Sequence, residues 1–242
     1  RNFSSNNVVL SVVGDISSEK LINLMDNHLS QIPKSDVTVK RIPEFTEFPK
    51  GKTYFVERPL AQTVVMFGQK AVNIKDKSFY PLNMINYILA GGSFESRLMQ
   101  EIREKRGLAY SVISYIDHND IASTLEGVFA TDATKVNESL AVFKTEIAKL
   151  KKDGITEEEL SLAKNYSIGS FALKLDSYEK LVNYLNFMQI EGLGTDFLER
   201  RNSMVQAITY DDIKKANAEI FKPNDMTIVV VGKVNDAIPA DH

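Results

Sequence analysis

The sequence predicts an α+β fold in which a block of helices packs on one face of a largely antiparallel or mixed sheet. Strand-like segments rich in β-branched and aromatic residues recur between residues 53 and 131, and residues 133–221 have an almost wholly helical pattern. One more strand-like segment, Thr227–Gly232, follows the helices and returns the chain to the sheet. Strands followed by helices and then by a final strand are typical of this fold class.

Local composition predicts each element of the first part of the chain. Apolar and β-branched runs indicate strands at residues 7–16, 53–56, 63–72, 108–116 and 121–131. Apolar residues at helical spacing indicate helices at residues 17–29, 78–89 and 94–105. The pair Gly91-Gly92 is interpreted as a helix terminator, because it is not part of a phosphate-binding glycine motif.

The helical block between residues 133 and 221 is predicted to contain several helices. Its pattern is broken at Asp153-Gly154, at Gly192–Gly194 and at Thr209. The polar stretch Asp117–Asp120 before it has the composition of a turn between two paired strands. The chain therefore alternates clear turn signals with long periodic segments.

The opening and closing strand-like segments resemble each other, which predicts the domain organisation. Gly14 and Gly232, which end the two apolar runs, lie 218 residues apart. If each copy closes a unit of about two hundred residues, residues 1–32 are the strand–helix tail of a preceding repeat and residues 52–242 form the next repeat. Residues 33–51 hold three of the seven prolines and are expected to be a linker. The start at Arg1, without a signal-like segment, favours a piece of a longer polypeptide.

Composition and charge exclude several classes of function. The formal net charge of −3 argues against a nucleic-acid partner, because phosphate-backbone binding needs a strongly basic face. No run of 18 apolar residues is present, so we expect no membrane span. The absence of cysteine excludes thiolate metal sites and a cysteine nucleophile.

The segment from residue 93 to residue 112 has a pattern that predicts a helix, a turn and a strand in this order. Ser93 is placed to cap a helix, Lys105 and Arg106 lie at its negative end, and Gly107 ends it. Arg103 is expected about 100° around the helix from Ile102, at the margin of the buried stripe, where it can lean over a cleft.

Past the turn at Gly107, strand alternation predicts which way the side chains point. Leu108, Tyr110 and Val112 are expected on one face of the strand, and the intervening residues on the other. A guanidinium from Arg103 and a phenol from Tyr110 can then converge across one turn.

This helix–turn–strand segment resembles the signature of the pitrilysin or insulinase family of zinc metallopeptidases, in the non-catalytic repeat of their C-terminal half. The similarity covers essentially the whole chain. It also includes the segments Val12–Asp15, Glu57–Thr63, Gly91–Ser93 and Gly154–Leu160 and the closing strand. The resemblance implies that residues 52–242 are a non-catalytic peptidase repeat of the pitrilysin type.

The resemblance also implies a site. In that family the non-catalytic repeat supplies an Arg and a Tyr that reach across a chamber to the substrate at the partner repeat's zinc, and the matching residues here are Arg103 and Tyr110. Both side chains can donate hydrogen bonds to a peptide carbonyl and stabilise charge on its oxygen in a tetrahedral intermediate. The expected partners are a peptide or unfolded polypeptide and a zinc-bearing catalytic domain or subunit.

No zinc site is expected in this chain. Catalytic repeats of the family hold zinc through an inverted H-x-x-E-H helix, which places two histidines on one helical face. The histidines here are His28, His118 and His242, and none lies within five residues of another. The acidic residues Glu57, Glu101 and Glu157–Glu159 lack histidine neighbours and are interpreted as charged surface. Zinc is therefore expected in the partner domain or subunit, and this chain alone is expected to be inactive.

Two other functions remain open at the level of sequence. The parent protein can be a non-proteolytic structural or interaction subunit of the same fold, or the chain can be a free-standing peptide-binding module. Retention of both Arg103 and Tyr110 favours the peptidase hypothesis, because a purely structural subunit does not need the pair. Bacterial relatives of the family favour the periplasm as the compartment, with the cytoplasm as the alternative.

Overall fold

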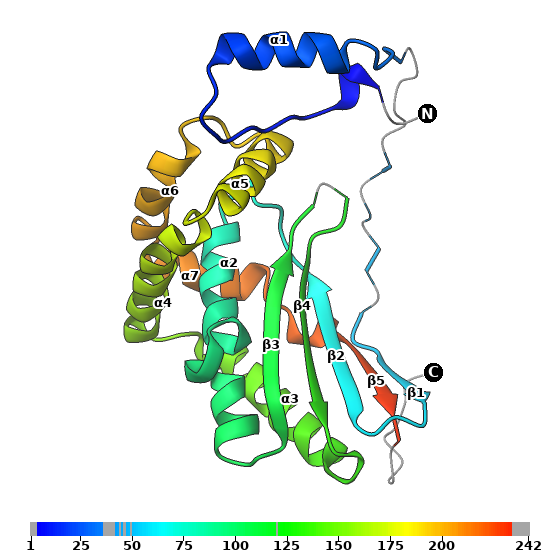
Figure 1. Cartoon of the computed structure of the whole chain (residues 1–242). Helices are drawn as coiled ribbons and strands as arrows, with labels where there is room; N and C mark the ends of the chain where they lie inside the picture. Colours follow the sequence, from blue (N-terminus) through cyan, green and yellow to red (C-terminus); the bar gives the residue numbers. More distant parts are fainter. Residues whose placement is uncertain are drawn as a thin grey trace. The chain divides into compact units, whose positions relative to one another are not determined.

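A computed structural model of the chain describes residues 4–35, 42–43, 45, 47–48, 50–119 and 121–233. The chain forms two compact units (Figure 1). The first comprises residues Arg1–Pro43 and Ser167–Ser203, and the second comprises Glu44–Tyr166 and Met204–His242. The second unit contains the sheet and the residues of the candidate site.

The sheet of the second unit has five strands, and its order brings the closing strand to an interior position. The strands are β1 (Thr53–Glu57), β2 (Thr63–Lys70), β3 (Ala109–Asp117), β4 (Thr124–Thr131) and β5 (Thr227–Gly232). Their order is β1-β5-β2-β4-β3 (Figure 1). The pair β1–β5 is parallel, and the pairs β2–β5, β2–β4 and β3–β4 are antiparallel. The predicted mixed, largely antiparallel sheet is confirmed, and the closing strand has the predicted bounds.

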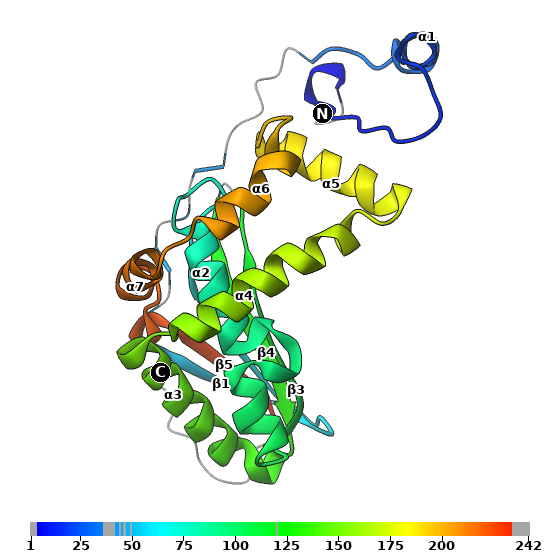
Figure 2. The same cartoon turned by 90° about the vertical axis from the view of Figure 1, so that its left-hand side faces the viewer.

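Helices cover one face of this sheet. The helices that lie wholly within the second unit are α2 (Phe79–Asn86), its π-helical continuation η2 (Tyr87–Gly91), η3 (Ser93–Glu95), η4 (Met99–Glu104), η5 (Ala133–Lys135), α3 (Val136–Asp153), α7 (Tyr210–Glu219) and η7 (Pro223–Asp225). Figures 1 and 2 show α2 and α3 on the same side of the sheet. The α+β architecture predicted from the order of strands and helices is therefore confirmed.

The core lies between the sheet and α3. Phe143 of α3 is buried and its ring lies 4.6 Å from that of Phe67 on β2 and 6.0 Å from that of Phe129 on β4. Gly127 on β4 leaves room for the Phe67 ring, which a Cβ at this position would meet. Period-two alternation along β2, β4 and β5 sends every second side chain into this core. The intervening side chains, such as Met66, lie on the opposite face and are partly or fully exposed.

The predicted helical block is divided at all three predicted breaks and at one more. Gly154 has a φ of +72° after α3, Gly192 has a φ of +62° at the end of α5 (Tyr178–Glu191), and Thr209 caps α7. The break that sequence reasoning missed follows α4 (Glu157–Gly169), where the 3-10 helix η6 (Ser170–Lys174) precedes the cap Ser177. The remaining helix is α6 (Phe197–Gln206). None of the helices in the described ranges has the length and apolar character of a membrane span.

The predicted opening strand is wrong for this structure. Residues 8–13 form no strand, a 3-10 helix η1 occupies Ser5–Asn7, and Val9 and Leu10 are 45% and 44% exposed. An extended segment becomes a strand only when its backbone pairs with a neighbour, and no described strand pairs with this one. The helix predicted after it is confirmed as α1 (Ser18–Leu29), with the side chain of Ser17 accepting a hydrogen bond from the amide of Lys20. No residue of α1 is buried.

The predicted linker, residues 33–51, falls partly outside the described residues, which omit 36–41, 44, 46 and 49. Its last part packs on the second unit. The amide of Phe45 donates a hydrogen bond to the carbonyl of Ile121 at 2.8 Å, and the Phe45 and Phe48 rings meet edge to face at 5.2 Å. Phe45 and Phe48 therefore pack within the second unit before β1 begins.

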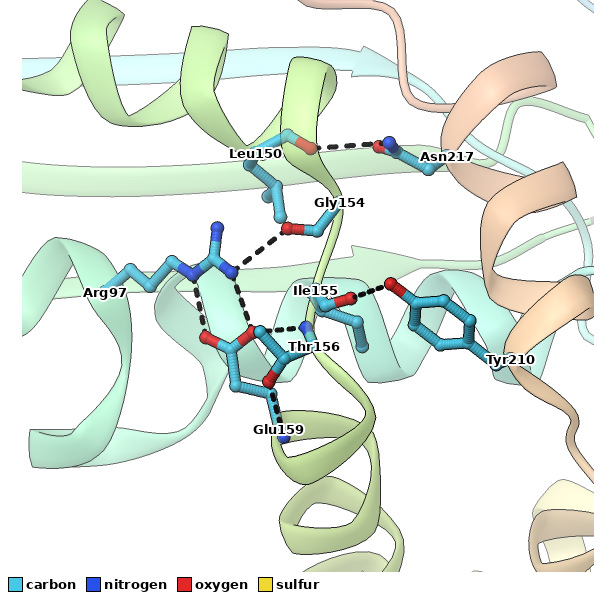
Figure 3. Close-up of polar contacts among 8 residues, drawn as sticks. All are labelled: Arg97, Leu150, Gly154, Ile155, Thr156, Glu159, Tyr210 and Asn217. Atoms are coloured by element: carbon cyan, nitrogen blue, oxygen red, sulfur yellow. Dashed lines mark hydrogen bonds and ion pairs between the residues drawn. The ribbon is translucent and has the colours of Figure 1, made fainter.

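The N-terminus of α4 is fixed by a polar network (Figure 3). Glu159 accepts hydrogen bonds from the backbone amide of Thr156 and from two nitrogens of Arg97, at 2.7–2.8 Å. Arg97 also donates to the carbonyl of Gly154 at 3.0 Å. The interpretation of Glu159 as charged surface is therefore wrong, because this carboxylate caps a helix and is three-quarters buried in a bidentate ion pair.

Candidate substrate-binding site

The candidate site begins with a helical segment that is not a regular α-helix. Sequence reasoning expects one α-helix at residues 94–105, whereas the structure has the 3-10 helix η3 at its start and the π-helix η4 at its end. The amide of Lys105 accordingly donates to the carbonyl of Gln100, five residues back, at 3.0 Å. The wider turn changes the direction of the last side chains, so the α-helical angle expected for Arg103 does not apply.

The turn after η4 brings its last residues close to strand β3. Gly107 has a φ of +58°, and its amide donates to the carbonyl of Arg103 at 2.8 Å. The next amide, that of Leu108, donates to the carbonyl of Ile102 at 2.8 Å. A left-handed glycine closing the helix in this way confirms the predicted C-cap. It places the first residues of β3 directly beside Arg103.

Strand β3 opens with a β-bulge, and the predicted alternation of its first residues is therefore wrong. Ala109 pairs with Thr131 and Val112 pairs with Phe129, so Tyr110 and Ser111 together oppose a single residue of β4. Both bulge residues are exposed, and Tyr110 is 81% exposed, while Val112 is buried. Tyr110 consequently does not share a face with Val112, because the extra residue shifts the alternation by one.

Arg103 lies close to two aromatic rings. The central guanidinium carbon of Arg103 is 4.5 Å from the ring centre of Phe94 and 4.9 Å from that of Tyr110. Both distances are within the range of cation–π attraction. The structure therefore brings together the two residues that the sequence predicts, through stacking of the ring on the guanidinium.

The hydrogen-bonding edge of this guanidinium is available. The Arg103 side chain is 25% exposed, and its Nε lies 3.5 Å from a carboxylate oxygen of Glu104. Neither terminal nitrogen of Arg103 donates a hydrogen bond to any residue that the structure describes. Because an arginine carries five N–H donors and stays charged, this side chain can bind a carbonyl or carboxylate oxygen.

Sequence reasoning missed Phe94. Its ring is 53% exposed, and its backbone carbonyl accepts a hydrogen bond from the side-chain amide of Gln100 at 2.7 Å. The sequence offers only a large apolar residue in the first turn of a predicted helix, and that pattern does not indicate that the Phe94 ring lies beside Arg103.

The neighbouring charges of η4 are paired with one another. Glu101 binds Lys105 and Arg106, each at 2.5 Å. Hydrogen bonds from Lys105 and then from Arg106 lower the pKa of the Glu101 carboxyl. These two cations are therefore neutralised locally, in contrast to Arg103. The interpretation of Glu101 as plain charged surface is corrected accordingly.

The sheet face that lies away from the core has a shallow apolar hollow of about 300 Å³. Its lining includes Phe48, Met66, Tyr115, Glu126, Val128 and Val229. The phenol of Tyr115 donates to a carboxylate oxygen of Glu126 at 3.3 Å, and the negative charge of Glu126 raises the pKa of that phenol. An apolar surface with a few polar groups is typical of a ligand-binding face.

The histidines do not form a metal site in the described part of the chain. His28 lies in α1 of the first unit, and His118 contacts the Phe79 ring edge to face at 5.4 Å in the second. His242 lies outside the described residues. Within the described ranges no three side chains of His, Cys, Asp or Glu are grouped so that they could hold a metal ion.

Together, a sheet covered by helices on one face, an apolar hollow on its other face and the contacts of Arg103 with two aromatic rings describe an α+β domain. The family model described as the peptidase M16 inactive domain matches residues 1–167 of the chain. The chain belongs to this family, and the family resemblance read from the sequence is confirmed.

Relatives and solved structures agree with this assignment. A Helicobacter pylori protein named "Non-peptidase homolog YmxG" is 27% identical over 233 residues, which cover 95% of this chain and 52% of that protein. A Bacillus subtilis protein named "Uncharacterized zinc protease YmxG" is 33% identical over 72% of this chain and 42% of that protein. The crystal structure of a peptidase M16 inactive domain from Pseudomonas fluorescens superposes with a TM-score of 0.86 at 28% identity, covering 99% of this chain and 56% of that one. The chain thus spans about half the length of each of these three proteins.

Proposed function

We propose that this chain forms one wall of a peptide-binding chamber in a zinc peptidase, and that Arg103 and Tyr110 contact the bound peptide. The zinc would be held by another domain or by a partner subunit. The observation that carries the proposal is the Arg103 guanidinium, which lies close to two aromatic rings and has terminal nitrogens without a partner among the described residues. The apolar hollow on the open face of the sheet supports it.

The chemistry of the pair fits an extended peptide. The positive charge of Arg103 would attract a carbonyl oxygen of the peptide, and this attraction grows as negative charge develops on that oxygen in the tetrahedral intermediate. The phenol of Tyr110 is a neutral donor that can share the same oxygen or bind the next one. Removal of one such donor typically costs about 2.7–4 kcal/mol of transition-state stabilisation.

The proposal is tested in the full-length protein combined with its zinc-bearing domain or subunit, with unfolded peptides as substrates. We expect Arg103→Ala and Tyr110→Phe to lower kcat/KM, Arg103→Ala by about 10²–10³-fold, while thermal unfolding stays unchanged. Arg106→Ala and Tyr115→Phe are matched controls, because Arg106 is paired with Glu101 and Tyr115 with Glu126. Wild-type rates in both test variants at normal stability would refute the assigned roles.

A second candidate function is a non-proteolytic structural or interaction subunit of the same fold. The name of the Helicobacter pylori relative, a non-peptidase homolog, favours it. In that case the full-length protein would cleave no peptide even when zinc and its partner are supplied. Peptide cleavage that depends on Arg103 excludes this second candidate.

We also propose that residues 1–32 are the tail of a preceding repeat and that residues 52–242 are the non-catalytic repeat, joined by the linker 33–51. The exposed apolar side chains of residues 8–12 and the absence of any buried residue in α1 support the proposal. A segment of this composition is expected to be covered by another part of the protein.

A further inference from the structure

We infer that Phe94 is a positioning residue for Arg103 and that Phe94 and Tyr110 act together as a clamp. The two rings hold the guanidinium so that its N–H edge faces outward to an oxygen of the bound peptide. The inference rests on the proposed function and adds to it a residue that touches Arg103 and acts through it. The three residues Phe94, Arg103 and Tyr110 are called the aromatic clamp below.

The clamp restrains a side chain that has little else to hold it. Among the residues that the structure describes, the only ionic contact of Arg103 is the 3.5 Å approach of its Nε to Glu104, which is longer than a good charge-assisted hydrogen bond. Arginine has many rotamers, and ordering it at the moment of binding lowers affinity. A guanidinium that is already stacked on Phe94 loses less freedom when it binds an acceptor.

The backbone of Phe94 is held in place by a hydrogen bond from a side chain. Gln100 donates a side-chain hydrogen bond to the Phe94 carbonyl at 2.7 Å, across the bend between η3 and η4. The ring is half-exposed, so removing it opens no core cavity. We therefore expect substitution of Phe94 to disturb Arg103 and to leave the stability of the fold unchanged.

The geometry also selects the direction of binding. The ring centres of Phe94 and Tyr110 lie 4.5 Å and 4.9 Å from the guanidinium carbon, so both rings occupy space beside the guanidinium. An acceptor must then approach the N–H edge, which suits a planar carbonyl or carboxylate group. Without the Phe94 ring, Arg103 could rotate away from Tyr110 and the two donors would no longer be aligned.

The test uses full-length protein labelled with ¹⁵N-arginine, and the variants Phe94→Leu and Phe94→Trp. The Nε–H signal of Arg103, assigned through Arg103→Lys, is expected to be displaced by the ring currents of the clamp. Phe94→Leu should move this signal toward that of solvent-exposed arginines, and Phe94→Trp should keep it displaced because tryptophan also attracts cations. Phe45→Leu, which removes another half-exposed ring, is the control and should leave the Arg103 signal unchanged.

Peptide cleavage is measured on the same variants. Phe94→Leu should lower kcat/KM by about twofold to fivefold, and Phe94→Trp should restore it, because exposed cation–π contacts contribute free energies of this order. An Arg103 signal that does not change in Phe94→Leu overturns the positioning role, whatever Arg103→Ala does to cleavage. A signal that changes, combined with normal cleavage by Arg103→Ala, supports the clamp as a structural contact and overturns the proposed function.

Discussion

The Glu159 carboxylate binds the Thr156 amide and the Arg97 side chain, which in turn binds the Gly154 carbonyl. Protonation of Glu159 should therefore change the stability of the fold. Burial raises the pKa of Glu159, but hydrogen bonds from Arg97 and from the Thr156 amide outweigh it, so the pKa lies below its ordinary value of 4.5. A carboxyl whose pKa is depressed on folding stabilises the folded state above its unfolded pKa. That stabilisation is lost as the pH falls through the folded pKa.

We predict that Glu159→Gln lowers the free energy of unfolding at neutral pH by about 1–3 kcal/mol, since a part-buried charged hydrogen-bond network is broken. The effect of the substitution should shrink as the pH falls from the ordinary pKa of a glutamate through the lower pKa of folded Glu159, where the carboxylate of the wild type becomes protonated. Urea unfolding of the two proteins at several pH values measures the loss of unfolding free energy at neutral pH and its decrease at lower pH. Glu158→Gln is the matched control, because Glu158 is exposed, and equal effects of the two substitutions would refute the role of the network.

At the scale of the elements, the two π-helical segments and the end of α2 protect the edge of the sheet. Strand β3 lies at the end of the strand order, and η2 and η4 pack against it. The amide of Val112 donates to the sulfur of Met99 at 3.2 Å, and Asn86 donates to the carbonyl of Ser114 at 3.3 Å. Gly91 allows this approach, because a Cβ there would lie 2.7 Å from the Asn86 amide nitrogen. Backbone groups that would invite a foreign strand are thereby occupied.

The opening segment, residues 8–13, by contrast forms no strand and exposes most of its apolar side chains. The proposal that it belongs to a preceding repeat leads to a prediction for these side chains. In the alignment of the two echoing segments, Leu10 corresponds to Ile228, which is buried, and Val9 corresponds to Thr227, which faces the open side of the sheet. In a protein that contains the preceding repeat, Leu10→Asp should destabilise by about 3 kcal/mol or more, since it buries a charge, and Val9→Asp should have a small effect.

The two substitutions form a matched pair, because Val9 and Leu10 are equally exposed in this chain. Thermal unfolding of the full-length protein measures the difference. Similar melting temperatures for Leu10→Asp and Val9→Asp would contradict the assignment of residues 8–13 to a strand of a preceding repeat.

At the scale of the whole molecule, the proposed function places the zinc outside this chain. We predict that calorimetric titration of this chain with Zn²⁺ detects no tight stoichiometric site, because the described residues contain no suitable group of ligands. A chelator should abolish peptide cleavage by the full-length protein and leave the melting temperature of this chain unchanged. Stoichiometric zinc binding by the isolated chain would overturn the assignment of the metal to another domain or subunit.

Much of the fold follows from local signals in the sequence. The strand Thr227–Gly232, the cap at Ser17 and the breaks at Gly154 and Thr209 are recognisable because apolar period and capping chemistry act over a few residues. The pair Arg103 and Tyr110 could also be chosen before the fold was known, through the resemblance of the segment that carries them. The opening strand could not be decided in this way, because a β-branched run predicts a strand only when a partner is present.

The sequence alone determined the class of fold, the family and the two candidate residues, since these depend on periodicity and on a recognisable segment. Tertiary structure decided how the site is built. The bulge at Tyr110 and Ser111 turns the tyrosine outward, the π-helix η4 changes the direction of Arg103, and Phe94 closes the aromatic clamp. Each of these depends on packing between segments that no local pattern encodes, because one extra residue in a strand or a helical turn redirects every side chain beside it.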